Sequence, residues 1–238
     1  MSSTHLVLVP SYNTGAKLGE TIAEALRHWQ TVWVVIDGST DGSDAALKQD
    51  EPGLRVIHRP TNGGKGAAVL DGLRAAAAAG FTHVLVMDAD GQHPAAKITE
   101  LMAISQQNPQ AMILGLPQFD ASAPRIRVIG RRISNVLARL ETRCDIGDAL
   151  FGFRVYPLVP LLDVMAASRH MRRYDFDTEA VVRLCWRGVK VINHPVPVRY
   201  FTAAQGGVSH FRYGRDNLHL AAMHARLIAA ALFRPFRR

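Results

Sequence analysis

The residues most able to do chemistry stand directly after a short hydrophobic run, where residues 87–93 read MDADGQH. In an extended chain Asp88 and Asp90 point the same way, and Gln92 adds a third oxygen on that face. Such oxygen ligands suit Mg²⁺ or Mn²⁺, which proteins usually hold with one or two carboxylates and the phosphates of a substrate. The pattern therefore predicts a cation site for a phosphate-bearing ligand; the alternative is a solvated turn without chemistry.

Three further polar or glycine-rich segments occur where hydrophobic runs end. They are VPSYN at 9–13, VIDGSTDGS at 35–43 and NGGKGAA at 62–68. Each is expected to follow a strand and to open a helix. Ligands of parallel α/β sheets bind beyond the carboxyl ends of the strands, so the four segments should converge on one crevice.

Short β-branched runs alternate along the chain with segments of helical character, which predicts an α/β fold with a mostly parallel central sheet flanked by helices. The strands are expected at 6–9, 32–36, 54–58, 84–87 and 112–116. The helices are expected at 17–29, 43–49, 66–79 and 94–107. Residues 117–124, which contain two prolines, are expected to form a loop between a donor half and an acceptor half.

Composition fits an ordinary globular protein. The 238 residues are 48% hydrophobic, and the two cysteines lack the spacing of a disulfide framework or a zinc site, which favours a reducing cytoplasm. No leader or membrane-spanning segment is recognisable, so we expect a protein that is neither secreted nor transmembrane. The net charge of +8 favours anionic partners such as nucleotide diphosphates or membrane surfaces. Nucleic acid is not expected, because no basic stripe alternates with aromatic residues.

In their order, the four segments resemble the nucleotide-sugar domain of glycosyltransferase family 2, including its dolichol-phosphate and polyprenyl-phosphate enzymes. The resemblance implies the GT-A fold in one domain, with a nucleotide-sugar half at 1–116, an acceptor half at 117–215 and a C-terminal helix with a basic tail at 216–238. It also implies inverting, metal-dependent transfer of a sugar from a nucleoside-diphosphate sugar to a lipid-linked or hydrophobic acceptor. Mg²⁺ or Mn²⁺ would be held by Asp88, Asp90 and Gln92.

On the donor side, the resemblance and the chemistry of the side chains select six residues, of which Asp88 also binds the metal. They are Pro10, Tyr12, Asn13, Asp37, Lys65 and Asp88. Tyr12 has the alternative of an aromatic at the edge of the core, and residues 39–43 also suit a helix cap. The sequence departs from the family at Ile36, where an aspartate is usual, and at Thr14, where a glutamate is common.

The glycine-rich segment 62–68 has a competing interpretation as a nucleotide-binding P-loop. It fails that pattern, because Gly66 and not a hydroxyl residue follows Lys65. We expect instead that backbone amides at a helix N-terminus, together with the Lys65 ammonium, attract the anionic donor.

Two later segments resemble the family's acceptor side: DALFGFR at 148–154 and YDFDTE at 174–179. Asp148 is the first choice for a general base, and Asp177 is the second. A hydroxyl acceptor needs such a base, whereas an ionised lipid phosphate does not. Alternatively, Asp177 and Glu179 only stabilise the first turn of a helix. Arg154 is expected to bind a phosphate or to pair with a carboxylate.

The segment QGGVSHFRYGRDN at 205–217 resembles a soluble bacterial branch of the family that is associated with aryl-polyene or lipid pathways. Its His210, Arg212 and Arg215 are candidate ligands of the donor diphosphate, with a purely structural histidine as the alternative.

Residues 218–233 are expected to form a helix that either lies in a membrane interface or docks on the sheet. The expected location is the cytoplasm, with the inner face of the membrane as a second option. An alternative of another class is a catalytically weak, membrane-associated binding or scaffold protein, motivated by the departures at Ile36 and Thr14.

Overall fold

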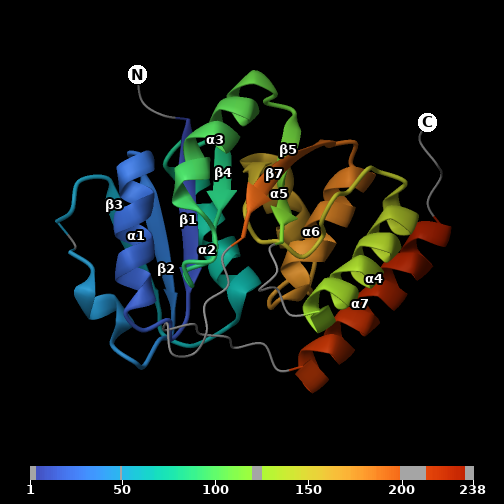
Figure 1. Cartoon of the computed structure of the whole chain (residues 1–238), viewed down its shortest axis with the longest axis horizontal. Coiled ribbons are helices and arrows are strands. Elements are labelled where there is room, and N and C mark those ends of the chain that lie inside the picture. The colour runs from blue at the N-terminus through green and yellow to red at the C-terminus, as the bar shows by residue number, and fades with distance from the viewer. Residues whose placement is uncertain (1–3, 49, 120–124, 199–212, 234–238) are drawn as a thin grey trace.

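The computed structural model describes residues 4–48, 50–119, 125–198 and 213–233. They form one seven-stranded sheet with helices on both faces (Figure 1). The strand order is β3-β2-β1-β4-β6-β5-β7. All strand pairs are parallel except those of β6, which runs antiparallel to both β4 and β5. The expected α/β fold with a mostly parallel sheet is therefore confirmed.

The five expected strands are present, and two more follow them in the chain. The strands are β1 (His5–Ser11), β2 (Val32–Asp37), β3 (Leu54–Arg59), β4 (His83–Val86), β5 (Ala111–Gln118), β6 (Arg154–Pro157) and β7 (Lys190–Pro197). Every residue of β1 and β4 is buried, because helices cover both faces of the sheet there. This explains why these strands read as continuous apolar runs.

Seven helices and two short 3-10 turns surround the sheet in the described parts of the chain. They are α1 (Lys17–His28), η1 (Ser43–Ala46), α2 (Lys65–Ala78), η2 (Ala95–Lys97), α3 (Ile98–Gln107), α4 (Arg125–Thr142), α5 (Leu158–Ala166), α6 (Asp175–Trp186) and α7 (Tyr213–Leu232). The helix expected at 43–49 was wrong: only η1 forms there. Ser43 is its one buried residue, so this segment gains too little packing to extend into a helix.

The two faces of the sheet pack against different helices. Leu6 and Leu8 of β1 point toward α2, α5 and α6, whereas Val7 and Val9 point toward α1 and α3. Helix α2 lies close to β1 because Gly72 faces Leu8: a Cβ at position 72 would lie 2.5 Å from the Leu8 Cδ1 atom. Beyond this sandwich, α4 and α7 pack side by side and both contact α6 (Figure 1).

Candidate active site

The four segments singled out in the sequence meet at one cavity of about 1110 Å³. It lies at the edge of the sheet where β1, β2 and β4 end, and α4, α6 and α7 close its other side. The predicted site residues that line it are Pro10, Tyr12, Asp37, Lys65, Asp88, Asp90, Gln92, Asp177 and Arg215. Residues separated by up to 205 positions in the chain thus share one space, as the strand-end argument predicts.

Asp37 ties the end of β2 to the glycine-rich loop. Its carboxylate accepts hydrogen bonds from the backbone nitrogens of Gly63 and Gly64, at 3.0 and 2.7 Å, and it pairs with the Arg59 guanidinium. Gly64 has φ of +95°, and a Cβ there would lie 2.6 Å from the Arg172 carbonyl oxygen, so only glycine fits. Asp37 therefore holds the start of α2 in place at the wall of the cavity.

The pKa values of Asp88 and Asp90 are shifted in opposite directions. Burial alone would raise the pKa of Asp88, but the Lys65 ammonium lowers it below its usual value. Burial, and then the charge of Asp88, raises the pKa of Asp90 to about 6. The backbone nitrogen of Gln92 donates to Asp90 Oδ1 at 3.0 Å, which fixes the turn. A concentration of negative charge therefore faces the cavity.

His93 supports this turn from below, a role that the sequence did not reveal. Its Nδ1 accepts a hydrogen bond from the Asp88 backbone nitrogen at 3.0 Å, and its ring lies against Phe151 and Phe153. Burial lowers the pKa of His93 to about 4, so the ring is neutral at physiological pH. The neutral ring therefore positions the Asp88 backbone without adding a positive charge beside its carboxylate.

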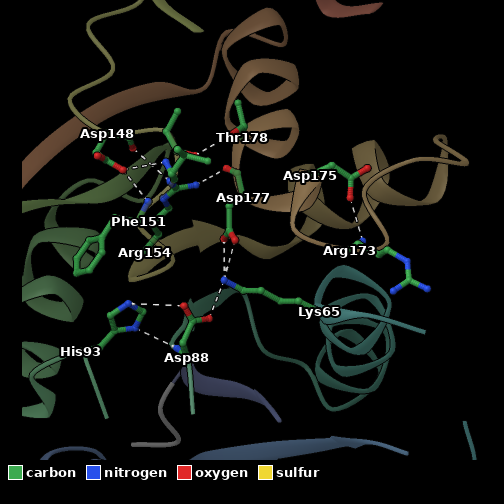
Figure 2. A network of polar contacts seen from close by, with 12 residues as sticks. Lys65, Asp88, His93, Asp148, Phe151, Arg154, Arg173, Asp175, Asp177 and Thr178 are labelled. Atoms are coloured by element: carbon green, nitrogen blue, oxygen red, sulfur yellow. Dashed lines mark hydrogen bonds and ion pairs between the residues drawn. The ribbon is translucent and has the colours of Figure 1, made fainter. Parts of the chain in front are cut away.

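Lys65 joins the two sides of the cavity (Figure 2). Its Nζ lies 2.6 Å from Asp88 Oδ1, and 3.0 and 2.8 Å from the two carboxylate oxygens of Asp177. Burial alone would lower the pKa of Lys65, but the two carboxylates raise it above its usual value. Burial raises the pKa of Asp177 although Lys65 opposes this. The Lys65 ammonium thus pairs with Asp88, just after β4, and with Asp177, in the first turn of α6.

The cavity suits a cation that is shared with a substrate. In the described parts of the chain, no three His, Cys, Asp or Glu side chains are grouped as metal ligands. What the cavity offers is two carboxylates, Asp88 and Asp90, with the Gln92 amide beside them. Mg²⁺ and Mn²⁺ are commonly held by two carboxylates and substrate phosphates, and such an ion would relieve the repulsion that raises the pKa of Asp90. These residues therefore fit the expected metal.

Asp148, the first candidate for a general base, does not line the cavity. Its Oδ1 accepts hydrogen bonds from the backbone nitrogens of Leu150 and Phe151, at 2.8 and 2.6 Å, and from Arg131 at 2.9 Å. Its Oδ2 accepts one from Asn135 at 3.3 Å. The carboxylate is 2% exposed and anchors the 148–151 turn to α4.

Arg154 and Asn13 also lie away from the cavity lining. Arg154 is fully buried and donates to the backbone carbonyls of Asp148 and Asp177 rather than to a carboxylate side chain (Figure 2). It also donates to the Tyr156 hydroxyl. Asn13 binds the 39–40 turn: its side-chain Oδ1 accepts from the Thr40 nitrogen at 2.7 Å. Both residues position loops of the site. His210 and Arg212 lie outside the described residues.

Several residues of the cavity were not anticipated: no helix was predicted over α4, and His224 lies on a helix that was expected but was not assigned to the site. Arg131 and Ser134 of α4 and His224 of α7 line it. His224 contacts Ser134 at 2.8 Å and Glu141 at 2.8 Å, which joins α4 to α7. The helical spacing of apolar residues between 126 and 140 is the signal that would have revealed α4.

The surroundings of Gly152 leave no room for a side chain between Phe151 and Phe153. A Cβ at this position would lie 2.5 Å from the Lys65 Nζ and 2.8 Å from Asp88 Oδ2. The backbone therefore approaches the two charged side chains as closely as only glycine allows.

A family model described as Glycosyl transferase family 2 matches residues 6–160. Among curated proteins, polyprenol monophosphomannose synthase of Mycolicibacterium smegmatis is 25% identical over 214 residues, covering 86% of this chain and 79% of the relative. Undecaprenyl-phosphate mannosyltransferase of Micrococcus luteus is 25% identical over 206 residues, covering 80% and 82%.

Two solved structures share the architecture. Glucosyl-3-phosphoglycerate synthase of Mycobacterium tuberculosis, crystallised with Mn²⁺, UDP and glucosyl-3-phosphoglycerate, has a TM-score of 0.65 at 20% identity, covering 97% of this chain and 79% of that one. Mannosyl-3-phosphoglycerate synthase of Rubrobacter xylanophilus has a TM-score of 0.62 at 16% identity, covering 98% and 77%. These likenesses confirm the GT-A fold. No helix in the described ranges is long and apolar enough to cross a bilayer.

Proposed function

Because the chain belongs to glycosyl transferase family 2, we propose that it transfers a sugar from a nucleoside-diphosphate sugar to a lipid-linked acceptor, with inversion at the anomeric carbon. The observation that carries this proposal is the cavity in which Lys65, Asp88 and Asp90 meet at the carboxyl edge of the sheet. Such an arrangement, with a cation site and a fixed ammonium in one place, suits the charge of a pyrophosphate.

The donor is expected to lie along the ends of β1, β2 and β4. Tyr12 offers an aromatic surface to the nucleobase. The backbone amides of Gly63 and Gly64 are already bound to Asp37, so the anionic part of the donor is assigned to Lys65 and the cation rather than to these amides. Asp88, Asp90 and Gln92 would hold Mg²⁺ or Mn²⁺, which supplies positive charge to the leaving diphosphate. Lys65 and Arg215 line the same cavity and stabilise negative charge as it develops there.

Between the two candidate bases, the geometry supports Asp177. Its carboxylate lines the cavity, where both oxygens accept hydrogen bonds from Lys65, and burial raises its pKa, which favours proton uptake. The Asp148 carboxylate is occupied by hydrogen-bond donors and lies behind the 148–151 turn. With an ionised phosphate as the nucleophile, neither carboxylate has to remove a proton.

A lipid phosphate is the acceptor class that we propose. The two curated relatives above are named for polyprenol and undecaprenyl phosphate chemistry. The two sequence departures do not argue against catalysis, because Ile36 is packed in the core beneath the site and Thr14 Oγ1 bonds the Ser11 hydroxyl at 2.5 Å. No feature of the described residues favours a scaffold protein in particular.

The test is a thermal-stability screen with uridine, guanosine and thymidine diphosphates, each with and without Mn²⁺. One nucleotide should raise the Tm in a Mn²⁺-dependent way, because a ligand that binds the folded state stabilises it. Asp90→Ala should abolish the Mn²⁺ dependence, whereas Asp163→Ala, which removes an exposed acid of α5, should retain it. The proposed site would be contradicted if Asp90→Ala kept the Mn²⁺ dependence, or if Asp163→Ala lost it as well.

A further inference from the structure

Helix α4 exposes a stripe of large apolar side chains to solvent. Ile129, Ile133, Val136 and Leu140 are 57%, 60%, 54% and 71% exposed. Their spacing of four, three and four residues places them on one face of the helix. Nothing in the core requires these side chains, since the opposite side of α4, with the buried Ala138, packs against the rest of the molecule.

Helix α7 carries a matching stripe. Leu218, Ile228 and Leu232 are 73%, 40% and 77% exposed, and the exposed Ala221 and Ala225 continue the same three-and-four spacing between them. The opposite side of α7 belongs to the core through residues 223 and 227. The C-terminal helix is therefore docked along one side, against α4 and α6, and apolar along the other.

The two stripes face the same way. His224 of α7 contacts Ser134 and Glu141 of α4, so the helices lie side by side, and in Figure 1 they run in the same direction. Since both helices turn their buried sides toward α6, both exposed stripes lie on the far side from it. Together they form one apolar surface, which we call the α4–α7 face.

The exposed charged side chains on α4 and α7 have one sign. Each helix contains a single acidic residue, Glu141 in α4 and Asp216 in α7, and these are only 5% and 3% exposed. Arg132 and Arg139, in contrast, are exposed and follow the apolar stripe of α4 along its flank, although the Arg139 Nε also donates to the Ile146 carbonyl at 2.7 Å. An apolar helix face with flanking arginines is complementary to an anionic phospholipid surface, where the arginine head groups reach the lipid phosphates.

The α4–α7 face reaches the active-site cavity. Ile129 and Ile133 of the α4 stripe and Ala221 of the α7 stripe also line the cavity that contains Lys65 and Asp88. We propose that the α4–α7 face docks on an anionic bilayer and holds the mouth of this cavity at the level of the lipid head groups. The phosphate of a membrane-resident acceptor then enters the site while its hydrocarbon chain stays in the membrane.

This inference rests on the proposed function for the identity of the acceptor, but not for the docking itself. A second copy of the chain would be the other occupant for two helical stripes of this spacing. Charge argues against it, because two such faces brought together would place the Arg132 and Arg139 side chains of both copies near one another without exposed acids on these helices to balance them.

Co-sedimentation of the full chain with vesicles tests the docking. We expect binding to equimolar phosphatidylglycerol and phosphatidylcholine, and weaker binding to phosphatidylcholine alone. The double variant Val136→Glu with Leu140→Glu, outside the cavity lining, should reduce binding to the anionic vesicles roughly tenfold or more. Leu232→Glu should act in the same direction from α7. Val159→Glu, equally exposed at 61% but on α5, is the matched control.

Each outcome decides the question. Unchanged vesicle binding by the double variant and by Leu232→Glu would overturn the proposal, as would a wild-type dimer in light scattering that the double variant makes monomeric. Reduced vesicle binding with normal stabilisation by nucleotide and Mn²⁺ would support it. If vesicle binding behaves as expected but no nucleotide stabilises the wild type, the proposed function fails and the docking surface stands.

Discussion

The two sides of the cavity are built on opposite principles. At the strand ends, charged side chains are buried and paired: Lys65 with Asp88 and Asp177, and Asp37 with Arg59. On the side of α4 and α7, apolar side chains are exposed and have no partner in the described structure that removes them from water. Buried charge must be compensated within the protein, whereas exposed apolar surface gains stability only from another molecule. The difference indicates a rigid donor side and an acceptor side that is completed by its surroundings.

The largest effect is expected from Lys65→Met, which removes the shared counterion of the polar side. The buried Asp177 and Asp88, whose side chain is 31% exposed, would remain close together without positive charge, which should lower the free energy of unfolding by about 3 kcal/mol and abolish transfer. Urea denaturation and a donor-consumption assay measure the two losses. Lys97→Met removes an exposed ion pair and should change stability by less than about 0.5 kcal/mol; equal losses in both variants would remove the contrast.

The second prediction separates Asp177 from Asp148. With a hydroxyl acceptor, Asp177→Asn should lower kcat about a hundredfold or more, and with a lipid phosphate much less. Asp148→Asn should instead lower the free energy of unfolding by about 1–3 kcal/mol, because buried backbone donors lose a charged acceptor. Steady-state kinetics with both acceptor types and denaturation of both variants decide. A large kcat loss for stable Asp148→Asn would reinstate Asp148 as the base.

Gly152→Ala tests how tightly the polar side is packed. The added methyl would displace the Lys65 Nζ or Asp88, so the rate of transfer should fall. The steric clash should also lower the free energy of unfolding by about 1–3 kcal/mol. Gly214→Ala in the first turn of α7 meets no atom within 4 Å and serves as the control. Equal activity of both variants would show that the geometry around Lys65 is tolerant.

A pH dependence is expected from His93, whose pKa is lowered to about 4 by burial. The unfolded chain takes up this proton near pH 6.5 and the folded protein only near pH 4, so stability is complete above pH 6.5 and is lost as the pH falls toward 4. Denaturation at pH 7 and at pH 5 should show a smaller pH-dependent loss for His93→Gln than for the wild type. His58→Gln, at a half-exposed ring, should keep the wild-type slope.

The smallest effect is expected on the apolar side. Leu140→Ser should leave the free energy of unfolding within about 0.5 kcal/mol of the wild type, since its side chain is 71% exposed. Leu227→Ser, at a fully buried position of α7, should cost roughly 2–5 kcal/mol by comparison. A large loss for Leu140→Ser would mean that the α4–α7 face stabilises the fold itself rather than waiting for a partner.

Local sequence was enough to predict the alternation of strands and helices, the four motifs at strand ends and the pair Asp88 and Asp90. Turn residues and side-chain periodicity act over a few residues, so they can be recognised in the sequence. That Gln92 and Tyr12 reach the same cavity also followed, because parallel strands end at one edge.

Only the tertiary structure decided which distant groups meet. Strand β6 enters antiparallel between β4 and β5, and the salt bridge from Lys65 to Asp177 spans 112 residues. The same path of the chain turns Asp148 inward to the 148–151 turn while Asp177, on α6, faces the cavity. Contacts of this kind depend on how whole elements pack, and the free energy of burying them is shared over the molecule, so no local pattern encodes them.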